Sequence, residues 1–139
     1  MGIVTRRGWA VLGLIAVMAL APVRSADRFG LLDGMVFVGF YGAQGKALDP
    51  AEREEMSFER GIFRSASCEP YGFAPTPYRA RREGDLIHFE ATITSPTHGT
   101  IAWKGSWDGK TARATYVWRK ERLFWDTRRE YWFQGVLTE

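Results

Sequence analysis

The chain has 139 residues, of which 45% are hydrophobic and 25% charged, and this size and composition are typical of one globular domain. Its formal net charge of +3 comes from Arg6, Arg7 and Arg24, because without them sixteen basic residues balance sixteen acidic ones. A nucleic-acid-binding surface needs an excess of positive charge, so the composition argues against a nucleic-acid partner.

Residues 1–26 have the organisation of a secretory signal peptide. Two arginines precede an apolar run from Gly8 to Ala21, and small residues follow near Ser25. The run is shorter than the roughly 20 residues that span a bilayer, so we expect cleavage and no stable membrane span afterwards. The arginine pair also resembles a twin-arginine export signal, and both export routes stay open. We therefore predict a periplasmic or secreted protein in which residues 27–139 form a single all-β domain.

The first predicted strand, residues 35–41, is apolar on both faces. We therefore expect it to be covered on both sides, by a helical segment or by a terminus. Residues 42–55 are polar and predict a surface loop. Within that loop Asp49 and Pro50 are suited to begin one helical turn.

A hairpin is predicted next, with strands at residues 56–60 and 62–67 closed around Gly61. The following stretch should be irregular, because it contains three prolines: Pro70, Pro75 and Pro77. Another strand is expected over residues 78–83.

Clear alternation of apolar and polar residues dominates the second half of the chain. It predicts strands with one buried face over residues 87–94, 101–107, 112–119 and 130–137. The dipeptide Asp108-Gly109 predicts a tight hairpin between the second and third of these strands.

Together these segments predict an all-β fold, an antiparallel up-and-down meander of about eight strands. Short sequential hairpins favour such a meander, and eight strands suffice to close a small barrel. A two-sheet β-sandwich is the alternative. The inward rows mix very large residues with glycine and alanine. Such a mixture either fills a tapered barrel interior or leaves a cavity beside flat aromatic side chains.

A Phe-Ser-Cys-Gly-Phe series precedes the aromatic-rich half. Its members are Phe63, Ser65, Cys68, Gly72 and Phe73. In this order the chain resembles a group of small secreted bacterial proteins of unknown function, over roughly residues 33–138. The resemblance implies export and a small β domain, and no catalytic role. More loosely, Gly105-Ser106-Trp107 is similar to the Gly-x-Trp element of lipocalins, which implies a calycin-like barrel and ligand binding.

Aromatic residues are the candidate ligand-binding set. Lining a cavity, they would suit a small apolar or aromatic ligand, with tyrosine hydroxyls and tryptophan N–H groups setting its orientation. The alternative is that they only fill the core. The candidates are Tyr41, Phe89, Trp103, Trp107, Tyr116, Trp118 and Tyr131.

Other reactive residue types give weaker signals. Cys68 is the only cysteine, so no internal disulfide can form; it is either a buried, inert thiol or a reactive one. His88 and His98 lack the spacing of metal ligands, and no metal or other cofactor is predicted. Glu54 and Glu55 are interpreted as a solvated loop face rather than an acid/base pair.

Two basic clusters lie at residues 79–82 and 119–122, interleaved with acidic residues. They are typical of a solvated, salt-paired surface, and the alternative is contact with an anion or a partner protein.

No phosphate loop, nucleophile elbow or dinucleotide fingerprint is present, so no catalytic residue is assigned. We predict an exported, non-catalytic β-barrel that binds a small apolar or aromatic ligand. The alternative is a periplasmic interaction or inhibitor module that binds an envelope protein through its loops, residues 42–55 and 68–77.

Overall fold

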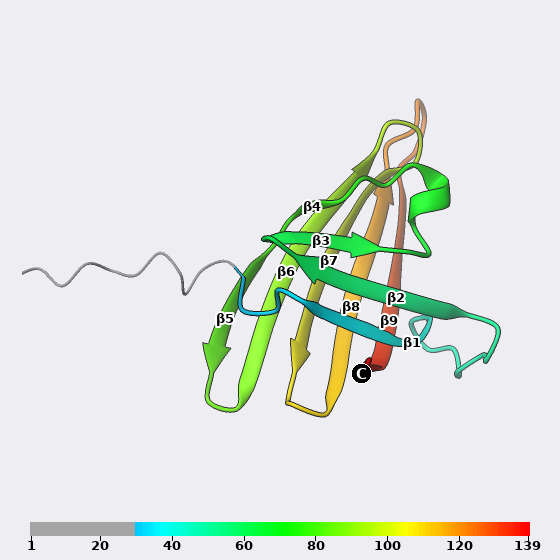
Figure 1. Cartoon of the computed structure of the whole chain (residues 1–139). Coiled ribbons are helices and arrows are strands. Elements are labelled where there is room, and N and C mark those ends of the chain that lie inside the picture. Colours follow the sequence, from blue (N-terminus) through cyan, green and yellow to red (C-terminus); the bar gives the residue numbers. More distant parts are fainter. Residues whose placement is uncertain (1–29) are drawn as a thin grey trace, which may run out of the picture.

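The computed structural model describes residues 30–139, which form one antiparallel sheet (Figure 1). The predicted signal peptide lies outside these residues. Within them, the one helical element is the 3₁₀ helix Glu69–Tyr71, and no helix has the length and apolar character that a membrane crossing requires. The strands are β1 (Met35–Ala43), β2 (Arg53–Glu59), β3 (Ile62–Ser65), β4 (Thr76–Pro77), β5 (Arg79–Glu83), β6 (Leu86–Ser95), β7 (Gly99–Trp107), β8 (Thr111–Lys120) and β9 (Thr127–Leu137).

The sheet curls into a nearly closed barrel, because β1 pairs with β2 on one side and with β9 on the other. All other neighbours follow chain order, as in a meander. The outermost strands of the sheet, β4 and β5, are separated in the chain only by Tyr78, so the two edges meet there. Together they act as one bent strand, which pairs first with β3 and then with β6. This arrangement confirms the predicted meander, rather than a two-sheet sandwich.

Two segments differ from the predictions. β2 begins at Arg53, so the end of the predicted loop 42–55 belongs to the sheet; the inward alternation of Glu54, Met56 and Phe58 continues through it. β4 was not predicted, because prolines argue against strands in general. Pro77 is tolerated here because β4 is the edge strand of the sheet. At Asp49 and Pro50 a single turn forms, closed by a hydrogen bond from Glu52 N to Asp49 O (3.0 Å), and the Asp49 carboxylate accepts a hydrogen bond from Ala51 N (2.9 Å); the turn does not continue into a helix.

Both predicted hairpins form, but one is centred differently. The β2–β3 turn has Arg60 and Gly61 at its centre, both with positive φ (52° and 74°), as a type I′ turn requires. In the β7–β8 turn the central pair is Gly109 and Lys110, one residue later than predicted. Gly109 has φ 91° and takes the first central position, and the Asp108 carboxylate accepts hydrogen bonds from the amides of Lys110 and Thr111.

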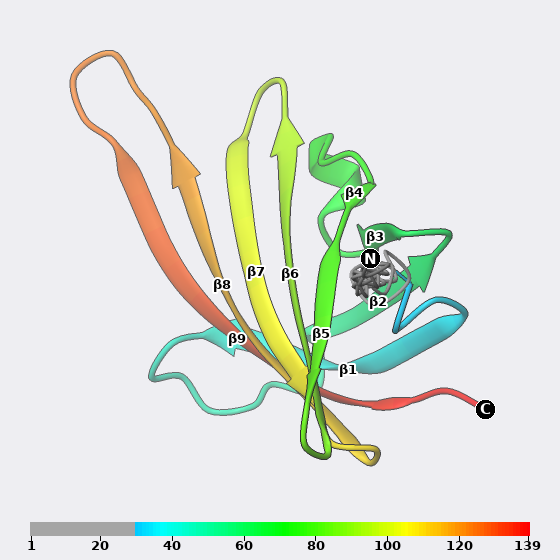
Figure 2. The same cartoon turned by 90° about the vertical axis from the view of Figure 1, so that its left-hand side faces the viewer.

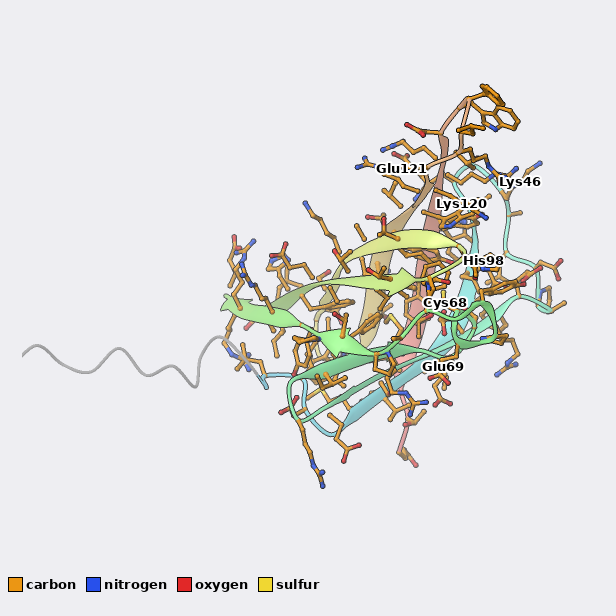
Figure 3. The ribbon with its side chains drawn as sticks, turned by 90° about the horizontal axis from the view of Figure 1, so that it is seen from above. Lys46, Cys68, Glu69, His98, Lys120 and Glu121 are labelled. Atoms are coloured by element: carbon orange, nitrogen blue, oxygen red, sulfur yellow. The ribbon has the colours of Figure 1, made fainter. Side chains whose placement is uncertain are left out.

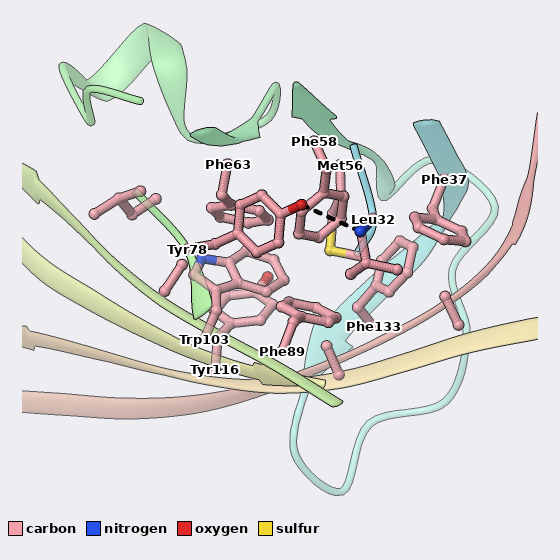
Figure 4. Packing of buried hydrophobic residues seen from close by; sticks show 14 of the residues in the cluster. Leu32, Phe37, Met56, Phe58, Phe63, Tyr78, Phe89, Trp103, Tyr116 and Phe133 are labelled. Carbon is pink, nitrogen blue, oxygen red and sulfur yellow. Dashed lines mark hydrogen bonds between the residues drawn. The ribbon is translucent and has the colours of Figure 1, made fainter. Parts of the chain in front are cut away.

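The interior of the barrel is built from the alternating rows that the sequence predicts. On β6, β7 and β8 the residues predicted to point inward are buried or half-buried, and their neighbours on the strand are mostly exposed. Figure 4 shows these rows packed against β1, β2 and β3. The largest fully buried side chains are Trp103, Tyr78, Phe37, Phe58, Phe63 and Phe133.

The outer face of β1 is only half-buried at Val36, Val38 and Phe40. The expectation that both faces of this strand are covered is therefore not met by residues 30–139. Phe40 is partly shielded by the Arg53 guanidinium, whose central carbon lies 5.4 Å from the ring centre, close enough for a cation–π contact.

One end of the barrel is plugged by the turn that precedes β1. Leu32 is fully buried, beside Phe37, Phe58 and Phe133 (Figure 4). The plug is fixed by Tyr78, whose hydroxyl accepts a hydrogen bond from Leu32 N (3.2 Å) and donates one to Asp33 Oδ1 (2.7 Å). The bend between β4 and β5 and the plug therefore stabilise each other.

Closure of the barrel requires glycine at position 39. Gly39 faces Gly135 across the β1–β9 pair, and a Cβ there would overlap the backbone oxygen of Gln134. We expect Gly39→Ala to lower the free energy of unfolding by about 2 kcal/mol, as overpacking does, although alanine otherwise suits a strand better than glycine. Urea denaturation measures this change.

Gly42→Ala is the matched control in the same strand. Its Cβ would lie 3.0 Å from the half-buried side chain of Trp132, which has room to move. We expect a change below about 1 kcal/mol for this variant. Equal destabilisation by the two substitutions would contradict a specific requirement at the β1–β9 seam.

Candidate ligand-binding pocket

A pocket of about 690 Å³ occupies the end of the barrel opposite the plug. Figure 2 shows β8 and β9 leaning away from β2 and β3 toward this end, and Figure 3 looks onto it. Its walls come from β1, β7, β8 and β9, from the 3₁₀ helix, and from the β1–β2 and β6–β7 loops. The lining residues include Tyr41, Lys46, Asp49, Glu52, Ser67, Cys68, Tyr71, Phe73, His98, Ile101, Tyr116, Trp118, Arg129 and Tyr131.

An aromatic ladder, defined as Trp103, Tyr116 and Tyr131, leads from the core to the pocket, where Tyr116 and Tyr131 form part of the wall. These residues are direct neighbours across β7, β8 and β9. The rings of Trp103 and Tyr116 are stacked at 3.9 Å, and those of Tyr116 and Tyr131 at 5.0 Å with planes 10° apart. The ladder therefore runs from the packed core to the pocket, and presents flat rings to whatever occupies it.

Four of the seven predicted ligand-binding residues line the pocket: Tyr41, Tyr116, Trp118 and Tyr131. The other three belong to the core. Phe89 packs on Phe58 (ring centres 5.0 Å apart), Trp107 packs on Phe37 (5.8 Å), and Trp103 lies behind Tyr116. The sequence identified the inward rows, and the structure separates those near the plug from those near the opening.

The rim of the pocket is held by contacts between loops. Trp118 Nε1 donates a hydrogen bond to the backbone oxygen of His98 (2.6 Å), which fixes the indole against the β6–β7 turn. The His98 ring makes an edge-on contact with Tyr71 of the 3₁₀ helix (5.4 Å). Lys46 and Arg129 face Asp49 and Glu52 around the opening, so the rim carries both charges.

Tyr41 and Tyr116 keep their protons at physiological pH. A hydrogen bond to Glu52, with burial, raises the pKa of Tyr41 well above its ordinary range. Burial raises the pKa of Tyr116 strongly as well. Both hydroxyls are therefore neutral. The Tyr116 hydroxyl is able to donate a hydrogen bond to a ligand, whereas the Tyr41 hydroxyl already donates to Glu52 and is able to accept one.

Beneath the pocket rim lies a buried carboxyl group, Glu54, which is only 3% exposed. Its Oε2 accepts hydrogen bonds from the hydroxyls of Ser65 (2.7 Å) and Ser67, and its Oε1 accepts from the amides of Glu55 (2.8 Å) and Ser67 (3.1 Å). The interpretation of Glu54 as part of a solvated loop face is therefore wrong. The missed signal was the spacing of Glu54 with Met56 and Phe58, which puts all three on one face of β2.

Cys68 lines the pocket but is only 7% exposed. Its sulfur lies 3.8 Å from the Ser67 hydroxyl, which in turn bonds to Glu54. Burial raises the pKa of the Cys68 thiol, and the nearby Glu54 carboxylate adds to this. The thiol is therefore protonated near neutral pH, which favours a buried, inert cysteine over a reactive one.

The histidines take separate positions. His88 lies on the outer wall, 3.5 Å from a Glu83 oxygen, while His98 lies at the pocket rim. Among residues 30–139, no three His, Cys, Asp or Glu side chains are grouped in a way that would hold a metal ion.

No protein-family model matches this chain, and neither a curated protein nor a solved structure is significantly similar to it. The similarity to small secreted proteins and to calycins is therefore limited to what the structure shows, an all-antiparallel, nearly closed barrel. Function has to be inferred from the geometry of the pocket.

Glu54 should make stability depend on pH. Burial raises its pKa in the folded chain above the ordinary value of 4.5, and hydrogen bonds from Ser67 and Ser65 only partly oppose this. Between these two pKa values the folded state binds more protons than the unfolded state, so the free energy of unfolding falls as pH rises from about 4.5. We expect Glu54→Gln to remove this decline, measured by urea denaturation at a series of pH values. An unchanged pH profile would contradict it.

Cys68 should react slowly in the folded protein. Because the thiol is buried and its pKa raised, we expect iodoacetamide at pH 7.5 to label the native chain at least 100-fold more slowly than the urea-unfolded chain. Mass spectrometry follows the reaction. Comparable rates in the two states would show that the thiol is accessible through the pocket.

Proposed function

We propose that this protein is an exported, non-catalytic β-barrel that binds a small apolar or aromatic ligand in the pocket at its open end. The observation that carries the proposal is a hollow of about 690 Å³ beside the stacked rings of Tyr116 and Tyr131. This volume falls within the roughly 300–1,000 Å³ typical of small-molecule sites, which are mostly apolar with a few placed polar groups.

The lining favours a flat, largely uncharged ligand. Tyr116, Trp118 and Tyr131 offer ring faces, and the neutral hydroxyl of Tyr41 is able to accept a hydrogen bond from a ligand. Lys46 and Arg129 at the rim are balanced by Asp49 and Glu52, so the opening has no strong preference for a ligand of one charge. By contrast, a depression of about 560 Å³ on the outer wall is lined mainly by charged or polar side chains, including Arg79, Arg81, Glu90 and Lys104.

The interaction-module alternative has one supporting observation. Leu48 and Tyr71, on the two loops that the sequence singled out, are 52% and 57% exposed; Tyr71 lines the pocket, and Leu48 lies over the outer wall of β1 and β9. A partner protein bound there would contact the rim and leave the interior empty. Substitution of the inner-wall rings distinguishes the two functions, because only ligand binding in the pocket should depend on those rings.

Binding of the neutral dye N-phenyl-1-naphthylamine tests the proposal. Its fluorescence increases in apolar surroundings, and it is small and flat enough for the pocket. We expect saturable binding at one site. Removing one wall ring, in Trp118→Ala or Tyr131→Leu, should raise the dissociation constant about fivefold, because an aromatic contact contributes on the order of 1 kcal/mol.

Trp125→Ala is the matched control, since Trp125 is 63% exposed in the β8–β9 loop and does not line the pocket. It should leave the affinity for the dye unchanged, and thermal unfolding should show that all three variants remain folded. Native mass spectrometry of the protein purified from its own host is an independent test. A bound ligand would appear as excess mass that is lost when the protein is denatured. Dye affinity that is unaffected by both wall substitutions would contradict the proposal.

A further inference from the structure

The β8–β9 loop, residues 121–126, carries the most exposed apolar side chains of residues 30–139. Leu123, Phe124 and Trp125 are consecutive in sequence and are 89%, 84% and 63% exposed. Figures 1 and 2 show this loop as the furthest projection at the open end of the barrel. Solvent-exposed loops are usually polar, so three adjacent large apolar side chains at a tip indicate a contact with something apolar.

Basic residues surround this apolar tip on both strands that lead to it. They are Arg119, Lys120, Arg122, Arg128 and Arg129. Three carboxylates lie in the same stretch, at Glu121, Asp126 and Glu130, and Glu130 forms an ion pair with Arg128. Five cations and three anions leave residues 119–130 with a net charge of +2, whereas residues 27–139 have sixteen of each. The excess positive charge is therefore concentrated beside the apolar tip.

We propose that the β8–β9 loop is a membrane-docking tip that inserts Leu123, Phe124 and Trp125 into the surface of an anionic lipid bilayer. Tryptophan favours the boundary between headgroups and hydrocarbon, and the long stems of arginine and lysine reach back to the headgroups. The basic residues on both sides of the tip would lie at the level of the lipid phosphates, where each one attracts anionic lipid.

The shape of the tip favours lipid over a partner protein. Three side chains on a narrow convex loop offer at most roughly 600 Å², taking about 200 Å² for a large side chain. A stable protein interface needs about 800 Å² from each partner, usually from a broader surface. A bilayer requires no complementary shape and accepts a small convex insertion.

Docking in this way would turn the open end of the barrel toward the membrane. Trp118 and Arg129, which line the pocket, lie on β8 and β9, the strands that end in the tip. The inference itself does not depend on pocket binding, because it rests on the exposure and charge of the loop alone.

Partitioning into vesicles tests the proposal with residues 27–139, the chain without its predicted signal peptide. The vesicles contain phosphatidylcholine and phosphatidylglycerol in a 7:3 ratio, or phosphatidylcholine alone. The triple variant Leu123→Ser, Phe124→Ser and Trp125→Ser should reduce the partition coefficient for the anionic vesicles at least tenfold. Leu86→Ser is the matched control, since Leu86 is an exposed apolar residue (36%) at the opposite end of the barrel and should have no effect.

Fluorescence locates the contact independently of overall affinity. Brominated lipids quench tryptophans that enter the bilayer, and Trp125→Phe keeps an aromatic ring at the tip while removing its emission. We expect this variant to lose part of the quenching seen in the unaltered chain, and Trp132→Phe, on the outer wall of β9, to retain it.

The proposal is overturned if the triple variant partitions like the unaltered chain, or if Trp125→Phe retains the full quenching. Equal partitioning into neutral and anionic vesicles would overturn the assignment to an anionic surface. Failure here is distinguishable from failure of pocket binding. The triple variant should still bind N-phenyl-1-naphthylamine in solution, and Trp118→Ala should still bind vesicles.

Discussion

The pairing of β1 with β9 is the constraint on which the rest of the molecule depends. These are the first and last strands of the described chain, and seven residue pairs join them, from Phe37 with Leu137 to Ala43 with Tyr131. Only this long-range pairing turns a linear meander into a barrel with an interior. It is possible because Gly39 and Gly135 face each other, where the two backbones come too close for a side chain on either strand.

Once the barrel is closed, its interior divides into a filled half and a hollow half. Near the plug, large rings lie over residues without side chains: Phe89 occupies the space that a Cβ at Gly105 would need, and Phe133 does the same at Gly135. This pairing of large with small residues fills the end where Leu32 enters. At the other end β8 and β9 lean away from β2 and β3, and a pocket remains. The inward rows of large and small residues therefore fill the barrel near Leu32 and leave a pocket with aromatic walls at the other end.

Local pattern made the strands of the second half predictable, because each strand from β6 to β8 has one buried and one solvated face. The alternation of apolar and polar residues did not determine the register between β7 and β8, and so did not show which aromatic rings would be neighbours. A turn centred on Asp108-Gly109 would place Trp103 opposite Ala114, whereas the observed centre, one residue later, places it opposite Tyr116 and creates the ladder. Glu54 was missed for a related reason. A carboxylate is expected in solvent, and the four hydrogen bonds that allow its burial come from β2, β3 and the segment after it.

The pocket and the β8–β9 tip belong to the same end of the molecule, and the same two strands build both. β8 and β9 contribute Tyr116, Trp118, Arg129 and Tyr131 to the lining of the pocket, and their further extension carries the tip beyond the other loops. A barrel docked by this tip would present its opening to the bilayer surface, where apolar compounds are concentrated. An apolar ligand could then pass between lipid and pocket with little exposure to water, which is the costly step for such a molecule. Pocket and tip would then act together, because both lie at the end of the barrel that faces the lipid.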